Sequence, residues 1–418
     1  MLLPFGSTSI DKININYYDP LTEVYFLKEG VRTELILIFF GRIPFMKKHV
    51  VKLVLLIIAM MSFVPSNTEA KWKASSISKS RAWDKASLAM DQSGQPHVIY
   101  RDAVTYTLKH TYKKGRRWFT DTVDQEDSGW YNALAIDSLG HIHASYRAEL
   151  RGPDGSWESV LRYAYFDGAS WMTTTVDHVG GWTTSIAVDA DNRPHISYSD
   201  GDILMYARYD GYSWLIENTG FFACWFGETS IALTTSGRAY IGFLAAGSLP
   251  GPLYVANNES GSWEATQVGE GTDVGLALDS NGYPQVVYSS WWDGSGVLYS
   301  KYDGSIWTTE MILAKSDVGY GENPDIAIDP AGNIHVTFSF YTYKGERGLT
   351  KLMYAWYDGV KWNMEAADRS NAGYYTSLAL NNLGVPQVTY LKYNNDKVRS
   401  STIKYASKVV KKAPRSGK

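Results

Sequence analysis

The sequence predicts an all-β protein, a seven-bladed β-propeller with four antiparallel strands in each blade. Three observations predict this fold. A sevenfold internal repeat runs along the chain, every copy shows the apolar alternation of strands, and one tryptophan of the repeat is displaced from the end of the array to its start. The chain of 418 residues contains 14% aromatic residues and 37 glycines, which suits a globular β-rich protein with many turns.

Each copy of the repeat has four parts in a fixed order. An apolar alternation centred on an alanine comes first, and an Asp-x-x-Gly turn or a close variant follows it. A strand that ends in an aromatic residue is third, and a Leu-x-Tyr-like strand, a turn often written Asp-Gly and a tryptophan complete the copy. Repeats of roughly 40–50 residues with four strands are typical of propeller blades. The repeated alanines are Ala89, Ala135, Ala187, Ala232, Ala277, Ala327 and Ala379.

Two repeated positions have a clear physical role in this fold. Alanine suits the first strand because seven such strands converge near the axis, where space is scarce. The aromatic residue at the end of the second strand is expected to fill the wedge between neighbouring blades, where the most apolar area is buried. These aromatic residues are Tyr100, Tyr146, Tyr198, Phe243, Tyr288, Phe338 and Tyr390.

The repeat tryptophan shows how the ring closes. It occurs only six times after a copy, and the seventh copy stops at 403–407 without one. The segment KWKASSI at 71–77 has the missing tryptophan, Trp72, ahead of the first copy. We therefore expect strand 71–79 to complete the last blade and protect its edge. The predicted propeller spans 71–407, and 408–418 is predicted to be a basic tail. The six other tryptophans are Trp118, Trp171, Trp214, Trp263, Trp307 and Trp362.

Residues 46–70 have the three parts of a secretory signal. Lysines precede a short apolar run, and small residues suited to a cleavage site follow it. The apolar run is too short for an ordinary membrane span, so no stable membrane anchor is expected. Met46 is then the predicted start, and 1–45 is predicted to be a mis-called upstream extension. The expected location is secreted, either periplasmic or extracellular.

Charge and cysteine content narrow the function classes. The formal net charge is −3, which does not favour nucleic-acid binding. The single cysteine, Cys224, lies in the apolar segment FFACWF and is interpreted as a small buried hydrophobe. No cofactor is predicted, and the protein is expected to be a monomer.

Four histidines recur at one repeat position and invite a metal-binding hypothesis. His97, His143, His195 and His335 occupy it, but three other copies have tyrosine or glutamine there, at Tyr240, Gln285 and Gln387. A position that accepts all three residue types indicates polar packing between blades, whereas a metal needs ligands that converge. No metal site is therefore predicted.

The turn before the last strand of a blade carries a family resemblance. It reads DGASW (167–171), DGYSW (210–214), DGSIW (303–307) and DGVKW (358–362). In its position and its tryptophan it resembles the Asp-box of secreted bacterial BNR-repeat propellers, the sialidase-like superfamily, although here Asp and Gly are adjacent. The resemblance implies a propeller with structural turns. Sialidase activity is not expected, because 71–407 lacks the Phe/Tyr-Arg-Ile-Pro motif that the resemblance would require.

A binding site is expected on one face of the ring. The loops that leave the last strand of each blade gather there with those that join the second and third strands, and loops on rigid scaffolds often carry function. Flat aromatic rings beside carboxylates and arginines suit sugars. An alternative is that many of these aromatic residues only pack between blades. The candidate binding residues are Arg101, Trp130, Arg147, Trp182, Asp200, Trp225, Trp291, Trp292, Asp293, Tyr374 and Tyr375.

Three functions stay open at this stage. The favoured one is a non-catalytic binding module for a glycan or an extracellular protein. The alternative is a polysaccharide-active hydrolase or lyase on the same face, for which no spacing singles out catalytic residues among the candidates. The third is a structural component of a surface assembly. The catalytic candidates are Glu149, Tyr198, Asp200 and Glu228.

Overall fold

The computed structural model describes the following residues: 9–12, 25–29, 32–36, 71–78, 82, 84–152, 154–224, 227–247, 250–290, 296–316, 319–342, 349–393 and 401–409. The chain divides into two units, Met1–Thr68 and Glu69–Lys418. The first unit contains β1 (Ser9–Lys12), β2 (Tyr25–Glu29) and β3 (Arg32–Ile36), which form an antiparallel sheet. The predicted signal segment 46–70 lies outside the described residues, as does 410–418.

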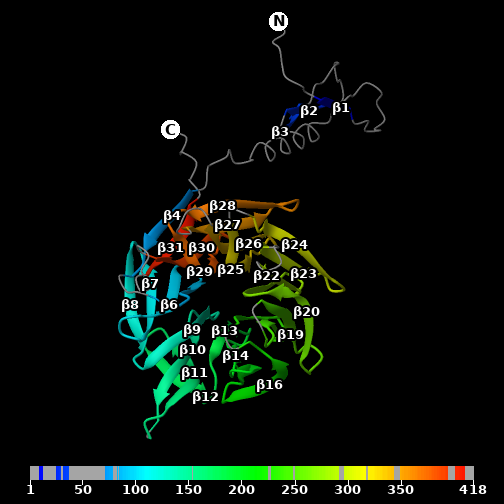
Figure 1. Cartoon of the computed structure of the whole chain (residues 1–418). Coiled ribbons are helices and arrows are strands. Elements are labelled where there is room, and N and C mark those ends of the chain that lie inside the picture. Colours follow the sequence, from blue (N-terminus) through cyan, green and yellow to red (C-terminus); the bar gives the residue numbers. More distant parts are fainter. Residues whose placement is uncertain are drawn as a thin grey trace, which may run out of the picture. The chain divides into compact units, whose positions relative to one another are not determined.

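The second unit is a ring of seven four-stranded antiparallel sheets (Figure 1). Blade 1 contains β5 (Ser87–Met90), β6 (Pro96–Arg101), β7 (Leu108–Lys114) and β8 (Arg117–Asp124). Blade 2 contains β9 (Asp127–Ile136), β10 (Ile142–Arg151), β11 (Trp157–Phe166) and β12 (Trp171–Asp177). Blade 3 contains β13 (Trp182–Val188), β14 (Pro194–Ser199), β15 (Ile203–Tyr209) and β16 (Trp214–Phe222).

The other four blades repeat this order. Blade 4 contains β17 (Thr229–Leu233), β18 (Ala239–Leu244), β19 (Gly251–Asn257) and β20 (Glu264–Gly271). Blade 5 contains β21 (Val274–Leu278), β22 (Pro284–Ser290), β23 (Gly296–Tyr302) and β24 (Trp307–Ala314). Blade 6 contains β25 (Gly319–Ile328), β26 (Ile334–Thr342), β27 (Leu349–Tyr357) and β28 (Trp362–Asp368). Blade 7 contains β29 (Ala372–Leu380), β30 (Pro386–Tyr393), β31 (Ser401–Val409) and β4 (Lys71–Ser76).

Blade 7 is completed by the N-terminal strand, where the repeat count placed it. β4 pairs antiparallel with β31 from Ser76 opposite Lys404 to Lys71 opposite Val409. Figure 1 shows the blue β4 beside the red β31. The predicted boundaries shift slightly, because β4 ends at Ser76 and β31 continues to Val409, two residues past the predicted end of the propeller.

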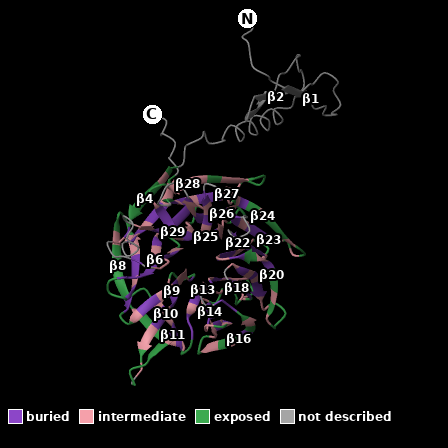
Figure 2. Ribbon diagram, in the orientation of Figure 1, coloured by how far each residue is buried: buried purple, intermediate pink, exposed green. Residues whose placement is uncertain are grey.

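Aromatic residues fill the wedges between the blades, as the repeat predicts. The aromatic residues at the ends of the second strands are at most 3% exposed. The repeat tryptophan of one blade packs edge-on against a ring of the preceding blade, as in Trp214 on Tyr163 at 5.0 Å between ring centroids and Trp362 on Tyr299 at 5.3 Å. Trp72 does the same on Tyr354, and its Nε1 donates to Glu365 at 2.8 Å. Figure 2 shows that exposed residues gather on the outer strands.

The repeat histidines serve packing, as the sequence indicates. His143 Nε2 lies 3.3 Å from Asp137 Oδ2, and its Nδ1 lies 2.7 Å from the Tyr163 hydroxyl. Burial lowers the pKa of His143, so the neutral ring donates to Asp137 and accepts from Tyr163. In blade 5, Gln285 makes the same two contacts, with Asp279 and Tyr299. Within the described residues, no group of three or more His, Cys, Asp or Glu side chains could hold a metal ion.

This equivalence of histidine and glutamine predicts how His143 tolerates substitution. His143→Gln is expected to change the free energy of unfolding by less than about 1 kcal/mol, because the amide can donate to Asp137 and accept from Tyr163. His143→Leu is expected to cost about 1–3 kcal/mol, because the Tyr163 hydroxyl loses its partner and Asp137 Oδ2 keeps only His141. Urea unfolding of both variants measures the difference. Equal losses for the two would contradict the hydrogen-bonding role.

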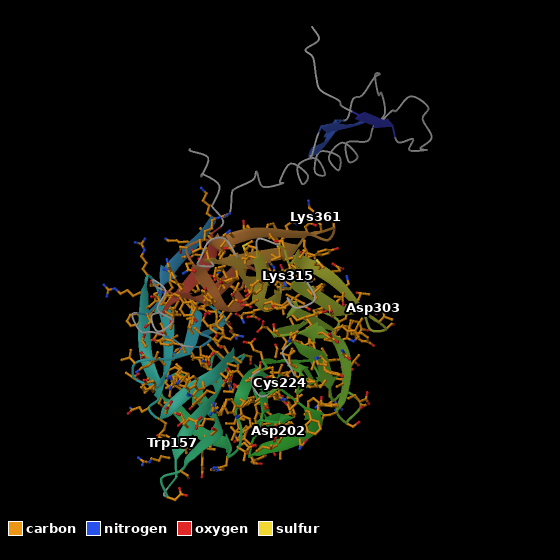
Figure 3. The ribbon with its side chains drawn as sticks, viewed as in Figure 1. Trp157, Asp202, Cys224, Asp303, Lys315 and Lys361 are labelled. Carbon is orange, nitrogen blue, oxygen red and sulfur yellow. The ribbon has the colours of Figure 1, made fainter. Side chains whose placement is uncertain are left out.

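The Asp-Gly turns that carry the family resemblance are capped by their own aspartates. Asp210 Oδ1 accepts from the backbone N–H groups of Tyr212 and Ser213, both at 2.8 Å. Asp303 makes the same two bonds in blade 5. Figure 3 shows Asp303 and Lys361, from two such turns, at the outer edge of the ring, and Cys224 nearer its middle. Cys224 is unpaired and 4% exposed, which confirms its interpretation as a buried hydrophobe.

Candidate binding face and axial cavity

The first strands begin with an unusual backbone conformation at one repeat position. Four residues before the repeat alanine, φ is positive at Tyr131, Thr183, Asn323 and Tyr375, with values of 48–52°. The pairing of β9, β13, β25 and β29 with their second strands is irregular at the same place. Non-glycine residues rarely adopt this conformation, and bulges of this kind often lie beside functional sites.

The same repeat position is polar in every blade. We call these seven residues the channel ring: Lys85, Tyr131, Thr183, Glu228, Asp273, Asn323 and Tyr375. Of these seven, the sequence analysis named Tyr375 as a binding candidate and Glu228 as a catalytic candidate. The signal that could have found the others is their constant distance, four residues, from the repeat alanine. The alanine marks the axial strand, so a polar residue at a fixed offset from it indicates a polar ring in the channel.

An axial cavity of about 280 Å³ opens among the first strands. Residues at or just before the first strands of all seven blades line it, including four members of the channel ring, Lys85, Tyr131, Thr183 and Glu228. Asp84 and Asp325 are also in its wall. A cavity of this size lies near the lower end of the range for small-molecule sites and matches a single sugar residue better than a larger ligand.

Carboxylates outnumber cations around this cavity. Burial opposes the charge on Lys85, but Glu228, Asp325, Asp84 and Asp273 outweigh it and raise the pKa of the lysine. Burial also raises the pKa of Glu228 to about 7, although Lys85 lowers it, and Asp273 raises it further. Asp84, Asp273 and Asp325 bind backbone N–H groups of the next blade, at Tyr131, Asn323 and Leu378. Within the described residues, Glu228 makes no hydrogen bond or ion pair.

The raised pKa of Glu228 predicts a pH-dependent stability. Between about pH 4.5 and pH 7 the folded chain holds a proton on Glu228 that the unfolded chain has released, so stability falls as pH rises through this window. Glu228→Gln removes the charge, and it is expected to stabilise the protein by up to about 3 kcal/mol at pH 8 and by almost nothing at pH 4.5. Urea unfolding at both pH values measures this, and a loss of stability at pH 8 would contradict it.

Two predicted tryptophans stack on predicted arginines of the preceding blade. The Arg147 guanidinium of β10 lies 3.5 Å from the ring centroid of Trp182, and that of Arg101 lies 3.9 Å from the centroid of Trp130. Arg147 also contacts Glu149 and donates to Ser159 at 2.8 Å. Tyr131, in the cavity wall, lies 5.8 Å from Trp182 between ring centroids. Trp182 therefore contacts the cavity wall, and Trp130 directly precedes Tyr131 of that wall in the chain.

Arg101 is more deeply placed than its position at the end of β6 indicates. It is 2% exposed, and its ion pair with Asp127 is 2.6 Å long. Its Nε and Nη1 have no hydrogen-bond partner. Tyr106 lies over it at 4.9 Å and is 46% exposed. Arg101 therefore supports Trp130 and Tyr106 from beneath, and the two aromatic residues are the ones a ligand can reach.

A glycine precedes each stacked tryptophan because the blades approach closely there. Gly181 has φ +80°, and a Cβ at this position would meet the Val160 carbonyl oxygen at 2.9 Å and Leu161 Cα at 3.0 Å. The preceding blade therefore leaves no room for a side chain beside Trp182. The Gly-aromatic pattern of these loops thus has a structural cause as well as a place on the candidate face.

The remaining candidate binding residues differ in their surroundings. Asp200 caps its own turn through bonds from the backbone N–H groups of Asp202 and Ile203. Tyr374 packs edge-on to Tyr393 at 4.4 Å, and Tyr375 belongs to the channel ring. Trp225, Trp291, Trp292 and Asp293 lie outside the described residues.

The four catalytic candidates differ in their partners and their burial. Glu149 is paired with Arg147, and Tyr198 is fully buried with its hydroxyl donated to Asp177 at 2.5 Å. Burial and that bond raise the pKa of Tyr198 far above its ordinary value. Glu228 differs, since it lines the cavity with a pKa near neutrality. It is the one of the four with the properties of a general acid or base.

No family model and no curated protein sequence matches the chain. Several solved structures share the fold. The polysaccharide lyase Uly1 is 9% identical, with a TM-score of 0.51 over 83% of this chain and 93% of that chain. An ulvan lyase, described as a new polysaccharide lyase family, is 10% identical, with a TM-score of 0.50 over 78% and 94%. The lectin BP39L from Burkholderia pseudomallei is 12% identical, with a TM-score of 0.49 over 77% and 96%. At these identities the likeness to the two lyases is one of fold.

Proposed function

We propose that this protein is an exported, carbohydrate-binding propeller that holds its glycan over the axial cavity. The observation that carries the proposal is the placement of two arginine-backed tryptophans, Trp130 and Trp182, beside a cavity lined by polar groups. Sugar rings present apolar C–H faces that stack on aromatic rings, and hydroxyl groups that bond to polar side chains. The guanidinium groups behind the tryptophans fix the rings before the ligand arrives, which lowers the entropy lost on binding.

The comparisons support a polysaccharide as the first ligand to test. Two propellers of the same fold are described as polysaccharide lyases. The export part of the proposal is supported by the signal-like segment 46–70 alone. In the described parts of the chain, no helix has the length and apolarity needed to cross a membrane. A relation to the sialidase-like superfamily stays a hypothesis, supported by the capped Asp-Gly turns.

A second candidate function is cleavage of the bound polysaccharide. Glu228 favours it, because a carboxyl group with a pKa of about 7 in a cavity can exchange a proton with a ligand near neutral pH. The binding function is preferred, since none of the other three catalytic candidates lines the cavity. A test for cleavage of the polysaccharide therefore distinguishes a binding protein from an enzyme.

The experiment is a glycan array with purified 71–418, with mass spectrometry of the same glycans after incubation. Saturable binding without new fragments is the expected result. Fragments of lower mass would favour the enzyme. Absence of both would contradict the carbohydrate proposal and favour a protein ligand or a structural role, which affinity capture from a bacterial surface fraction would then address.

A further inference from the structure

The wall of the axial cavity contains acceptors that have no donor. Asn132 is 2% exposed and donates its amide to the carbonyl oxygens of Lys85 and Gly129, but its Oδ1 has no partner. Thr183 is 4% exposed, and its Oγ1 also has no partner. Both residues line the cavity. A buried acceptor without a donor is costly, so a ligand that supplies N–H or O–H groups is favoured here.

The charged side chains of the cavity wall set a second requirement for the ligand. Glu228 is in the same wall and makes no hydrogen bond or ion pair with the residues the structure describes, while Asp84 and Asp325 lie in the wall with it. Lys85 is the one cationic side chain among the residues that line the cavity. The excess of carboxylates disfavours an anionic ligand such as a uronate and favours one that carries a positive charge.

A metal ion is a poorer fit than an organic cation. A divalent ion needs several ligands around one point, and among the described residues no group of three or more such side chains converges in that way. An ammonium group needs no fixed coordination geometry. It offers three donors, which match a carboxylate and two neutral acceptors.

We propose that the axial cavity binds the free amine of an amino sugar, with Glu228, Asn132 and Thr183 as its acceptors. The inference rests on the proposed carbohydrate function and names the class of sugar. The cavity of about 280 Å³ has room for one sugar residue. Lys85 faces the hydroxyl side of that residue as a donor, and Trp130 and Trp182 contact the neighbouring sugars of the chain.

The test compares glucosamine oligomers with their N-acetylated counterparts by titration calorimetry at pH 7. Wild-type protein is expected to bind the free amine at least about tenfold more tightly. Glu228→Gln and, separately, Asp325→Asn are expected to remove most of this preference, because they weaken binding of the free amine more than binding of the N-acetylated oligomer. A loss of folding would lower both affinities alike. The matched control is Glu126→Gln. Glu126 is exposed and lies between β8 and β9 on the same face, and this variant is expected to keep the preference for the free amine.

The remaining outcomes each decide the question. Equal binding of both oligomers overturns the amine site and leaves the carbohydrate function intact. A preference that survives both Glu228→Gln and Asp325→Asn places the amine elsewhere and also overturns the assignment. Tight binding of putrescine with weak binding of the oligomers shows an amine site that is not for sugars. Absence of all glycan binding contradicts the carbohydrate function itself, and the amino-sugar assignment falls with it.

Discussion

A chain that begins at Ile77 is expected to lose at least about 4 kcal/mol of its unfolding free energy, or to fail to fold. Removal of β4 deletes the fourth strand of blade 7, exposes the edge of β31 and leaves Tyr354 of blade 6 without the Trp72 ring. Trp72 is half-buried, so loss of its ring alone is expected to cost less than the about 3–5 kcal/mol of a fully buried tryptophan, and loss of the strand pairing adds to this cost. The truncation also removes the hydrogen bond from Trp72 Nε1 to Glu365 Oε1, the oxygen that Lys408 Nζ approaches at 2.9 Å.

The control for this truncation is a chain that begins at Lys71. It lacks only residues ahead of β4, and its urea unfolding is expected to match that of the propeller in the full chain. A Trp72→Ala variant is expected to fall between the two. If the chain that begins at Ile77 were as stable as the one that begins at Lys71, the pairing of β4 with β31 would not be what closes the ring.

Trp182→Ala is expected to weaken glycan binding by about tenfold to a hundredfold. Aromatic anchors in partly enclosed sites commonly carry 2 kcal/mol or more of binding free energy. Trp182 is held flat by Arg147 at 3.5 Å and touches Tyr131 of the cavity wall. The substitution removes the stacking surface and frees the arginine, so affinity falls while the fold is kept. Calorimetric titration with the best glycan from the array measures the change.

A matched aromatic residue on the other face provides the control. Tyr212 is 95% exposed in the turn between β15 and β16, at the end of the blade opposite the candidate face. Tyr212→Ala is expected to leave glycan affinity unchanged. Equal losses for Trp182→Ala and Tyr212→Ala, or no loss for Trp182→Ala, would contradict a site at the axial cavity.

The sequence predicts the fold well because the fold is periodic. Because the pattern occurs seven times, a strand that is unclear in one copy can be recognised from the other copies. The displaced tryptophan, Trp72, identifies the strand that closes the ring. The repeat aromatics such as Tyr146 and Phe338 are buried because every wedge between blades has the same shape. Comparison of the copies also indicates that the repeat histidines have a hydrogen-bonding role, since Gln285 at the equivalent position makes the same hydrogen bonds.

The site is harder to predict because it depends on departures from the repeat. Trp130 and Trp182 are visible in the sequence, but their stacking on Arg101 and Arg147 joins residues of different blades. In the sequence, Lys85 is only a polar residue in a loop. Most of the carboxylates around it belong to other blades and come near it only where the seven first strands converge. The positive φ of the channel ring has no composition signal at Tyr131 or Tyr375, because glycine is not used there.

Hydrogen–deuterium exchange with and without the bound glycan tests the central claim most directly. The account predicts that saturating ligand slows exchange at the starts of the first strands, in 84–88, 129–134, 181–186 and 228–231. It also predicts no change in the Asp-Gly turns at 210–213 and 303–306. Protection confined to those turns, or to the outer strands, would show that the glycan does not bind over the axial cavity.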